Sequence, residues 1–198
     1  MWSKETKFFT GLTVLLFLIF GLWWIIYTPP KAENPEDYEK DRPQRGNPQA
    51  SVVVRVYFDF YCSHCKEVEV SLNQVLQNYG DKIKVEYRYA PINEASFVVD
   101  AAAECAQKQD KFFPYHDLLF AGQGQTLTLE KLNTFAVQVG LDTAKFSQCL
   151  ESQETLPIVN YDLKQAVRAG VTGTPTIFVN GQLIDWRNLE SSVARTLR

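Results

Sequence analysis

From Ser51 onward, the chain alternates between segments with the period of a strand and segments with the period of a helix. Residues 51–60, SVVVRVYFDF, are mostly β-branched and aromatic, which predicts a buried strand. Residues 82–91, KIKVEYRYAP, alternate apolar and polar positions and predict a second strand. Between them, residues 63–80 place apolar side chains at helical spacing and end at a glycine, which predicts a helix.

A long run of helical segments separates this first unit from a second set of strand signals. These helical segments are residues 94–109, 127–140, 142–150 and 154–170. Residues 174–186, TPTIFVNGQLIDW, predict a hairpin with Asn180-Gly181 as its turn, and residues 188–197 predict a closing helix. Strands that alternate with helices imply a sheet with helices packed against it. The predicted fold class is therefore α/β, with a helical insertion at about residues 93–170 of a domain spanning residues 50–198.

The N-terminal part of the chain has a different composition. Residues 8–27, FFTGLTVLLFLIFGLWWIIY, carry no charge and as a helix would span about 30 Å, the hydrocarbon thickness of a bilayer. Because Lys4 and Lys7 precede this run, we expect an anchor with residues 1–7 in the cytoplasm and the rest outside. A cleaved signal peptide is the alternative, but the following YTPPKAEN lacks a small-x-small cleavage site. Residues 28–49, rich in proline and charge, predict a semi-extended tether.

Composition and charge narrow the function classes. The chain has 198 residues, of which 45% are hydrophobic, enough for one domain with a sizeable core plus appendages. Its formal net charge of -3 argues against nucleic-acid binding, which favours a basic face. Only 2 histidines are present, which excludes a histidine-rich metal site.

The strongest candidate for chemistry is the sequence CSHC at the boundary between the first strand and its helix. Cys62 and Cys65 would share one face of the first helical turn, close enough for a short-loop disulfide. At a helix N-terminus, free N–H groups and the helix dipole favour a thiolate, so we expect a lowered pKa for Cys62. His64 would stabilise that thiolate further and make the disulfide a stronger oxidant. Cys62 is therefore the predicted attacking sulfur and Cys65 the resolving sulfur.

Two metal-binding uses of the same cysteines compete with this interpretation. A structural zinc site needs four ligands, usually in two closely spaced pairs, whereas Cys105 and Cys149 are isolated in the sequence. A copper carrier that uses Cys62, Cys65 and a histidine is the other alternative.

Several separated motifs resemble one known family. DFYCSHC, followed far downstream by VTGTPTIFVNG, resembles the DsbA-like branch of the thioredoxin superfamily. AAAECAQKQDKFFPYHDLLF and GLDTAKFSQCL resemble the helical insertion of its membrane-anchored members, of Gram-positive, actinobacterial or cyanobacterial type. The resemblance covers roughly residues 51–198. It implies a thioredoxin fold, with a central mixed sheet flanked by helices, and thiol–disulfide oxidoreductase activity without a cofactor or a metal.

The resemblance also implies roles for residues outside the cysteine pair. Pro175 would follow a cis peptide bond in a loop beside the cysteines. The backbone of Thr174 would pair there with an extended substrate segment. Phe60 and Tyr61 are predicted to form an exposed apolar rim that meets unfolded substrates. The simpler alternative for Pro175 is an ordinary proline at the first position of a strand.

Two positions depart from the family pattern. Val56 stands where family members often have a buried acid that moves protons, and the matching Asp59 would point to the other face of the strand. Glu86 or an ordered water is a possible substitute for that acid, and the sequence does not choose between them. Ser63 replaces the proline typical of strongly oxidising members, but His64 is present, so an oxidising pair is still expected.

The other two cysteines have a separate expected role. Four cysteines allow three pairings, and a local Cys62–Cys65 pair leaves Cys105 and Cys149 as its complement. A disulfide between them would staple the insertion and contribute roughly 2–4 kcal/mol in an oxidising compartment. Two buried free thiols or a second redox-active pair are the alternatives. His116 is expected to pack or cap a helix, and residues 122–126, GQGQT, form a loop without a phosphate-binding pattern.

Together these observations predict a membrane-anchored extracytoplasmic thiol–disulfide oxidoreductase, on the periplasmic or cell-wall side, that introduces disulfides into exported proteins. Its expected partners are unfolded or reduced exported proteins, the bilayer through residues 8–27 and, by resemblance, a quinone-linked DsbB-like or VKOR-like oxidase. No nucleic-acid partner is expected. Since the tether leaves no room for a dimerisation domain, a monomer is predicted. The alternatives are a disulfide reductase or isomerase, a metal carrier, and a non-catalytic binding module of the same fold.

Overall fold

A five-stranded sheet in the order β1-β3-β2-β4-β5 forms the centre of the domain. The computed structural model describes residues 35–198. Strands β2 and β3 pair in parallel, whereas the other neighbouring strands pair antiparallel. The sheet is therefore mixed, as expected from the family resemblance. The strands are β1 (Gln44–Gly46), β2 (Val52–Phe58), β3 (Ile83–Tyr89), β4 (Thr176–Val179) and β5 (Gln182–Ile184).

Helix α3 (Ser63–Tyr79) connects the parallel strands β2 and β3. Two parallel strands need such a crossover because a tight turn cannot bring the chain back in the same direction. The helix ends at Gly80, whose N–H bonds to the carbonyl of Leu76 at 2.8 Å. Its buried face packs on the sheet, since Val68, Leu72 and Val75 belong to the same core cluster as the side chains of β2 and β3. The order strand, helix, strand matches the sequence prediction.

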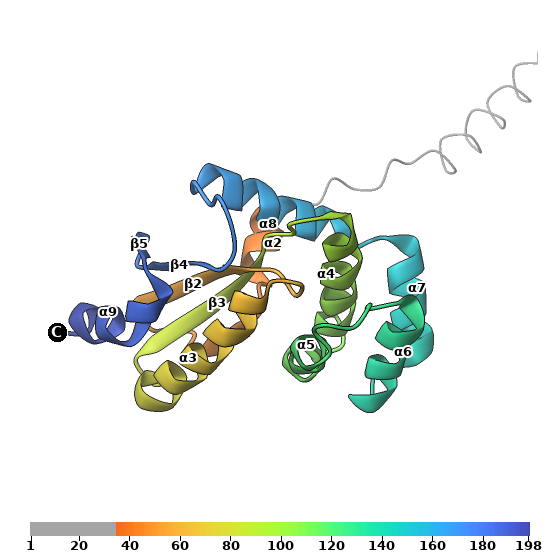
Figure 1. Cartoon of the computed structure of the whole chain (residues 1–198), viewed down its shortest axis with the longest axis horizontal. Coiled ribbons are helices and arrows are strands. Elements are labelled where there is room, and N and C mark those ends of the chain that lie inside the picture. The colour runs from red at the N-terminus through yellow and green to blue at the C-terminus, as the bar shows by residue number, and fades with distance from the viewer. Residues whose placement is uncertain (1–34) are drawn as a thin grey trace, which may run out of the picture. The chain divides into compact units, whose positions relative to one another are not determined.

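The predicted insertion between β3 and β4 consists of helices. They are α4 (Glu94–Gln107), α5 (Phe112–Ala121), α6 (Leu129–Gln138), α7 (Thr143–Ser152) and α8 (Leu156–Arg168). Side chains of Asn93, Thr128 and Asp142 accept hydrogen bonds from backbone N–H groups in the first turns of α4, α6 and α7, which fixes where these helices begin. Figure 1 shows α4, α5, α6 and α7 at one end of the sheet and α9 at the other.

The C-terminal part returns to the sheet as the predicted hairpin. Asn180 and Gly181 have φ values of 48° and 79°, the left-handed geometry that a two-residue hairpin turn requires. After β5 the chain forms a short 3₁₀ turn, η1 (Trp186–Asn188), and helix α9 (Leu189–Thr196), which packs against α3 and β4. Strand β4 thereby pairs with β2, the central strand of the sheet.

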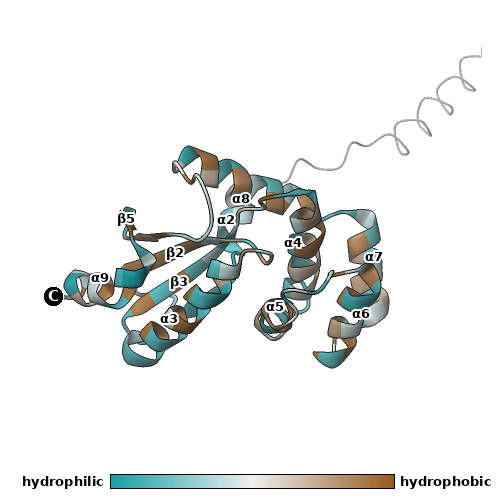
Figure 2. Ribbon diagram, viewed as in Figure 1, coloured by the Kyte–Doolittle hydropathy of each residue, from teal (hydrophilic) through white to brown (hydrophobic). Residues whose placement is uncertain are grey.

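One continuous hydrophobic core joins the sheet to the insertion. Buried side chains of β2, β3 and α3 belong to the same cluster as those of α4, α5, α6 and α7. Figure 2 shows hydrophobic stretches along β2 and hydrophobic and hydrophilic stretches alternating around the insertion helices. The insertion therefore shares its core with the rest of the domain.

The tether predicted at residues 28–49 is wrong for its C-terminal half. Residues Tyr38–Arg198 form one compact unit, and it includes β1 and the second half of α2 (Pro35–Lys40). Strand β1 pairs antiparallel with β3. At its end, Gly46 has a φ of 87°, and a Cβ there would collide with the carbonyl oxygen of Ile83, so only glycine fits. The folded domain therefore begins before residue 50.

Arg42 holds this N-terminal segment to the insertion. Its side chain is buried, with Nη2 3.2 Å from Glu104 Oε1 and Nη1 3.2 Å from Asp162 Oδ2. The tether prediction failed here because it relied on composition and hydrophobic periodicity. A short polar strand such as β1 and the buried ion pairs of Arg42 leave no periodic pattern of apolar residues in the sequence.

The predicted anchor at residues 8–27 lies outside the described residues. Within residues 35–198, none of the helices combines the length and the apolar character needed to cross a bilayer.

Candidate active site

Cys62 lies in the connection between β2 and α3, directly before the first residue of the helix. It is the N-cap residue of α3, with extended backbone, and its carbonyl accepts the N–H of Cys65 at 3.1 Å. Both cysteines are free thiols, Cys62 half-buried and Cys65 only 1% exposed. The strand-to-helix boundary predicted from the sequence therefore gives the two sulfurs unequal access to solvent.

The loop before β4 brings Thr174 against the first cysteine. Cys62 Sγ donates a hydrogen bond to the carbonyl oxygen of Thr174 at 3.2 Å, across 112 residues of sequence. The Thr174-Pro175 peptide bond is cis, as the family resemblance implied. Cys62, Thr174 and Pro175 are thus brought together by the pairing of β2 with β4.

The neighbours of the two sulfurs shift their pKa values in opposite directions. The Cys65 thiol donates to Cys62, and this bond, with the Thr174 side chain and the backbone N–H groups of Cys65 and His64, outweighs burial and lowers the pKa of Cys62 from 9.0 to about 5. Burial, with the bond to Cys62, raises the pKa of Cys65 far above its ordinary value. As a thiol, Cys62 donates a hydrogen bond to the Thr174 carbonyl. As a thiolate, it accepts hydrogen bonds from the Cys65 thiol, the Thr174 side chain and the backbone N–H groups. At neutral pH Cys62 is ionised and Cys65 protonated.

The imidazole of His64 lies elsewhere than predicted. The ring is 62% exposed and its Nδ1 lies 3.1 Å from Glu67 Oε2, one turn along α3. What His64 offers to Cys62 is its backbone N–H, as part of the helix N-terminus. The predicted thiolate stabilisation by the His64 ring is therefore replaced by the helix backbone.

Two side chains hold the turn that carries the cysteines. Asp59 is fully buried; its Oδ1 accepts the N–H of Tyr61 at 2.7 Å and its Oδ2 accepts the N–H of Ile92 at 2.9 Å. From the insertion, Gln123 Nε2 donates to the carbonyls of Phe60 at 2.7 Å and Cys62 at 2.9 Å. Gln123 was missed because its loop has no motif, and only the folded chain brings it to residue 62.

The predicted apolar rim at Phe60 is wrong. Phe60 is fully buried and its ring packs against Phe58 and Phe120 at centroid distances of 5.0 Å. A ring just beyond the end of a buried strand contributes more by filling the core than by facing solvent. Tyr61 is partly buried against the same core, so part of its side chain reaches the surface beside Cys62.

Glu86 does not serve the cysteines. Its carboxylate binds Arg55 Nη2 and Lys84 Nζ, both at 2.8 Å. Along β3, Val85 and Tyr87 point to the face covered by α3, so Glu86 between them points to the opposite face. The proposed substitute for the missing acid at Val56 must be sought elsewhere.

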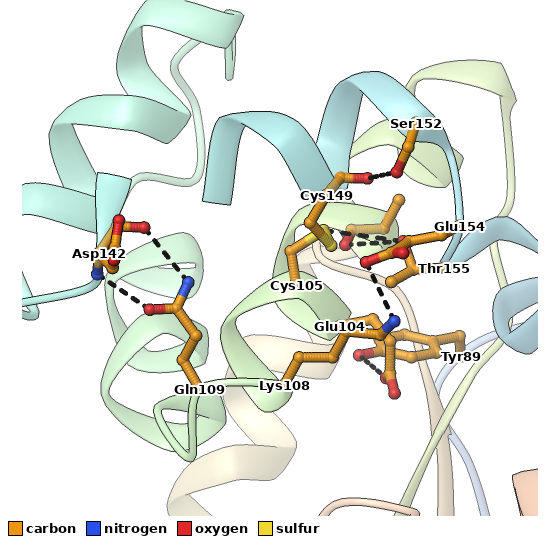
Figure 3. The surroundings of a disulfide bond; sticks show 11 residues. Tyr89, Glu104, Cys105, Lys108, Gln109, Asp142, Cys149, Ser152, Glu154 and Thr155 are labelled. Atoms are coloured by element: carbon orange, nitrogen blue, oxygen red, sulfur yellow. Dashed lines mark hydrogen bonds and ion pairs between the residues drawn. A yellow bond between two sulfur atoms is a disulfide. The ribbon is translucent and has the colours of Figure 1, made fainter. Parts of the chain in front are cut away.

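The other cysteines, Cys105 in α4 and Cys149 in α7, form a disulfide (Figure 3). Both are buried, and the hydroxyl of Thr155 lies 3.9 Å from Cys105 Sγ while bonding to the carbonyl of Ala101. Around them, Lys108 pairs with Glu154 at 3.0 Å. This bond staples two helices of the insertion.

Comparisons with known proteins agree with this fold. The family model described as thioredoxin matches residues 39–198. Among curated relatives, a Na(+)/H(+) antiporter NhaA of Herminiimonas arsenicoxydans is 32% identical over 184 residues, which covers 85% of this chain and 29% of the relative. The chain spans less than a third of the length of the curated relatives it matches first.

Solved structures show the same architecture. A thioredoxin-like oxidoreductase from Silicibacter pomeroyi superposes with a TM-score of 0.72 at 24% identity, over 84% of this chain and 98% of that one. BdbD from Bacillus subtilis superposes with a TM-score of 0.72 at 22% identity, over 80% of this chain and 94% of that one. The expected thioredoxin fold with a helical insertion is thus confirmed, and since the family model covers most of its length, the chain belongs to the thioredoxin family.

Proposed function

We propose that the chain is a protein thiol–disulfide oxidoreductase whose reactive pair is Cys62 and Cys65. One observation carries the proposal: two free thiols share a helical turn, yet one is half-exposed with a pKa of about 5 and the other is buried with a raised pKa. Such a pair can be attacked at one sulfur only, because the second is shielded from partners. The mixed disulfide then forms at Cys62, and Cys65 resolves it.

In the oxidising direction, a substrate thiolate attacks Cys62 of the Cys62–Cys65 disulfide. The bond between the two protein sulfurs breaks, and its electron pair goes to Cys65, which takes up a proton because its thiolate is unfavourable when buried. A second substrate thiolate attacks the substrate sulfur of the mixed disulfide and releases Cys62 as a stabilised thiolate. Two electrons have moved from the substrate dithiol to the protein pair.

The surroundings of Thr174 suit an unfolded protein as substrate. A groove of about 320 Å³ borders this loop, lined by Ala90, Pro91, Ile92, Leu163, Ala166, Val167, Val171, Thr172, Gly173 and Thr174. Ile92 and Val167 are 54% and 69% exposed there. Since unfolded chains expose apolar side chains, this groove takes the role that the sequence gave to Phe60, and we propose reduced, exported proteins as the clients.

The stabilised Cys62 thiolate favours one direction of thiol–disulfide exchange, the donation of a disulfide to the substrate. Whatever stabilises the reduced pair over its disulfide makes that disulfide a stronger oxidant. We therefore propose disulfide donation rather than disulfide reduction as the activity.

The test is the reduction potential of the purified full chain against glutathione buffers, with Cys62→Ser as the blank. A value near about -120 mV, typical of strong oxidants, supports disulfide donation. A value near about -270 mV, typical of thioredoxin, would make the protein a reductase. A chain that shows no exchange at all overturns the enzymatic proposal.

We further propose that residues 8–27 anchor the chain, with the redox domain outside the cell membrane and a quinone-linked DsbB-like or VKOR-like oxidase renewing the disulfide. The supporting feature is the uncharged apolar run preceded by Lys4 and Lys7. Deletion of residues 8–27 should move the protein from the membrane to the soluble fraction; a deletion variant that stays with the membrane contradicts the anchor. The antiporter names of the relatives carry no argument for ion transport here, since the chain spans less than a third of them.

A further inference from the structure

The thiol exchange proposed above needs a proton route for Cys65, and this inference rests on that function. Cys65 is 1% exposed, so water cannot deliver or remove its proton directly. The position of the usual acid is occupied by Val56, and Glu86 points to the opposite face of the sheet. A group that serves Cys65 must therefore be a buried titratable side chain on the α3 side of the sheet.

A buried histidine lies in this core. His116, in α5, is fully buried among aromatic rings, with centroid distances of 5.8 Å to Phe58, 5.6 Å to Phe60 and 4.8 Å to Phe120. Of these, Phe60 belongs to the turn between β2 and Cys62. An imidazole in such a cage is costly unless both ring nitrogens have polar partners. The partners of its two ring nitrogens therefore bear on the role of this histidine.

Both nitrogens of His116 face carboxylates. Nδ1 lies 2.9 Å from Asp117 Oδ1, and Nε2 lies 3.6 Å from Glu69 Oε1, just too far for a hydrogen bond. Asp117 is 63% exposed at its side chain, whereas Glu69 is 9% exposed. The ring thus bridges a carboxylate in solvent and a carboxylate in the core, and its inward nitrogen has no other partner.

Glu69 is the link to the cysteines. It follows Cys65 by four residues on the buried side of α3, so the two side chains are neighbours on one face, with Cβ atoms about 5–6 Å apart. Its Oε2 accepts the Tyr87 hydroxyl at 3.4 Å, which leaves Oε1 toward His116. We propose that Glu69 and His116 form the proton route that serves Cys65, with Asp117 as its opening to solvent.

The titratable and charged groups around the route are compatible with proton transfer. They are Glu69 of α3, Tyr87 of β3, Asp117 of α5 and, from β1, Arg45, which lies 3.5 Å from Asp117. Burial lowers the pKa of His116, but its hydrogen bond to Asp117 and its attraction to the carboxylates of Asp117 and Glu69 outweigh burial and raise it. Burial raises the pKa of Tyr87 well above its ordinary value, so this hydroxyl stays a donor to Glu69.

Solvent water is both the source and the final acceptor of the proton that this route carries. When a substrate thiolate breaks the disulfide, a proton from water passes through Asp117, His116 and Glu69 to Cys65, and each relay group ends in the state in which it began. During re-oxidation, Cys65 gives its proton to the Glu69 carboxylate as its sulfur attacks the mixed disulfide at Cys62, the partner leaves as a thiolate, and the proton returns through His116 and Asp117 to water. The route carries one proton in each direction and consumes no other reactant.

The deciding measurement is the closure of a Cys62–glutathione mixed disulfide by Cys65, followed in the full chain by glutathione release from pH 5 to pH 9. Glu69→Gln keeps the size of the side chain and an acceptor for Tyr87 but cannot carry a proton. We expect its closure rate at pH 7 to fall about tenfold or more and to recover toward wild type as hydroxide becomes the base. His116→Gln should show the same pH dependence of the closure rate. The pKa of Cys62, measured from the absorbance of its thiolate, should stay at the wild-type value.

Glu104→Gln is the matched control, since Glu104 is a buried glutamate in a separate ion-pair cluster. It should close at the wild-type rate. A wild-type rate and pH profile in Glu69→Gln would overturn the route, and so would a loss of equal size at every pH, which indicates packing alone. If His116→Gln does not fold, Glu69→Gln still decides. If the wild type itself does not close the mixed disulfide, the proposed function fails rather than the route.

Discussion

The chain contains two cysteine pairs with opposite environments. Cys62 and Cys65 lie in one helical turn, at a helix N-terminus and beside the Thr174 carbonyl. Cys105 and Cys149 are separated by 44 residues, are buried between two helices of the insertion and are joined. The first pair has donors that stabilise a thiolate, whereas the second has one hydroxyl at 3.9 Å.

The difference shows what makes a cysteine pair reactive within one protein. A disulfide exchanges when one sulfur is accessible and leaves as a stable thiolate. A bond that crosses two helices, with both sulfurs covered, stabilises the fold and offers no sulfur to a partner. The same residue type therefore serves two purposes, and local geometry decides between them.

The largest expected effect is the loss of Cys62. Cys62→Ser should abolish reduction of an insulin-type disulfide substrate and oxidation of a reduced one, because Cys62 is the only cysteine of residues 35–198 whose sulfur is accessible. Cys65→Ser should instead accumulate mixed disulfides at Cys62, detectable by mass. Activity retained in Cys62→Ser would show that another group carries out the exchange, and would contradict the distinction between a reactive and a structural cysteine pair.

Removal of the other pair should act on stability instead. The double change Cys105→Ala and Cys149→Ala should lower the free energy of unfolding by about 2–4 kcal/mol, because the unfolded chain regains the entropy of a closed loop. Thiol exchange at 25 °C should stay at the wild-type level. Denaturant unfolding of the oxidised protein gives the first value, and a lost exchange activity would show that the second pair is itself redox-active.

The pH response should belong to the first pair only. The folded pKa of Cys62, about 5, is below its ordinary value of 9.0, so its contribution to the stability of the reduced form is complete above pH 9 and is lost as pH falls through 5. Alkylation of Cys62 by iodoacetamide should fall about tenfold from pH 7 to pH 4, as the thiolate fraction falls. An alkylation midpoint near pH 8.5 would refute the stabilised thiolate.

The smallest effect should come from Gln123, which ties the insertion to the cysteine turn. Gln123→Ala removes two hydrogen bonds to the carbonyls of Phe60 and Cys62 and should cost about 1–2 kcal/mol of stability. Thiol exchange should slow by a few-fold as the turn loosens. Gln125→Ala, an exposed glutamine in the same loop, is the control and should change neither.

Local patterns predicted the elements whose residues interact with their neighbours in sequence. The β-branched run of β2, the helical period of α3 and the Asn180-Gly181 turn each specify their own structure. The cysteine pair at a strand-to-helix boundary belongs to the same class. These features needed no knowledge of the rest of the fold.

Long-range contacts are what the sequence pattern could not supply. Phe60 looked exposed because nothing local says that α5 covers it. Arg42 looked like part of a tether because its carboxylate partners, Glu104 and Asp162, lie far along the chain. His116 packs in the core as expected, but its approach to Glu69 across the fold has no local signal in the sequence. In each case the partner lies outside the local window.

The 112 residues between Cys62 and Thr174 have a consequence for how the protein is made. A ribosome finishes α3 and β3 long before it reaches the loop that faces Cys62, and β4 can pair with β2 only after the whole insertion has emerged. An incomplete nascent chain therefore carries the two cysteines without their opposing loop. The order of synthesis keeps the site from being assembled until nearly all of the polypeptide is present.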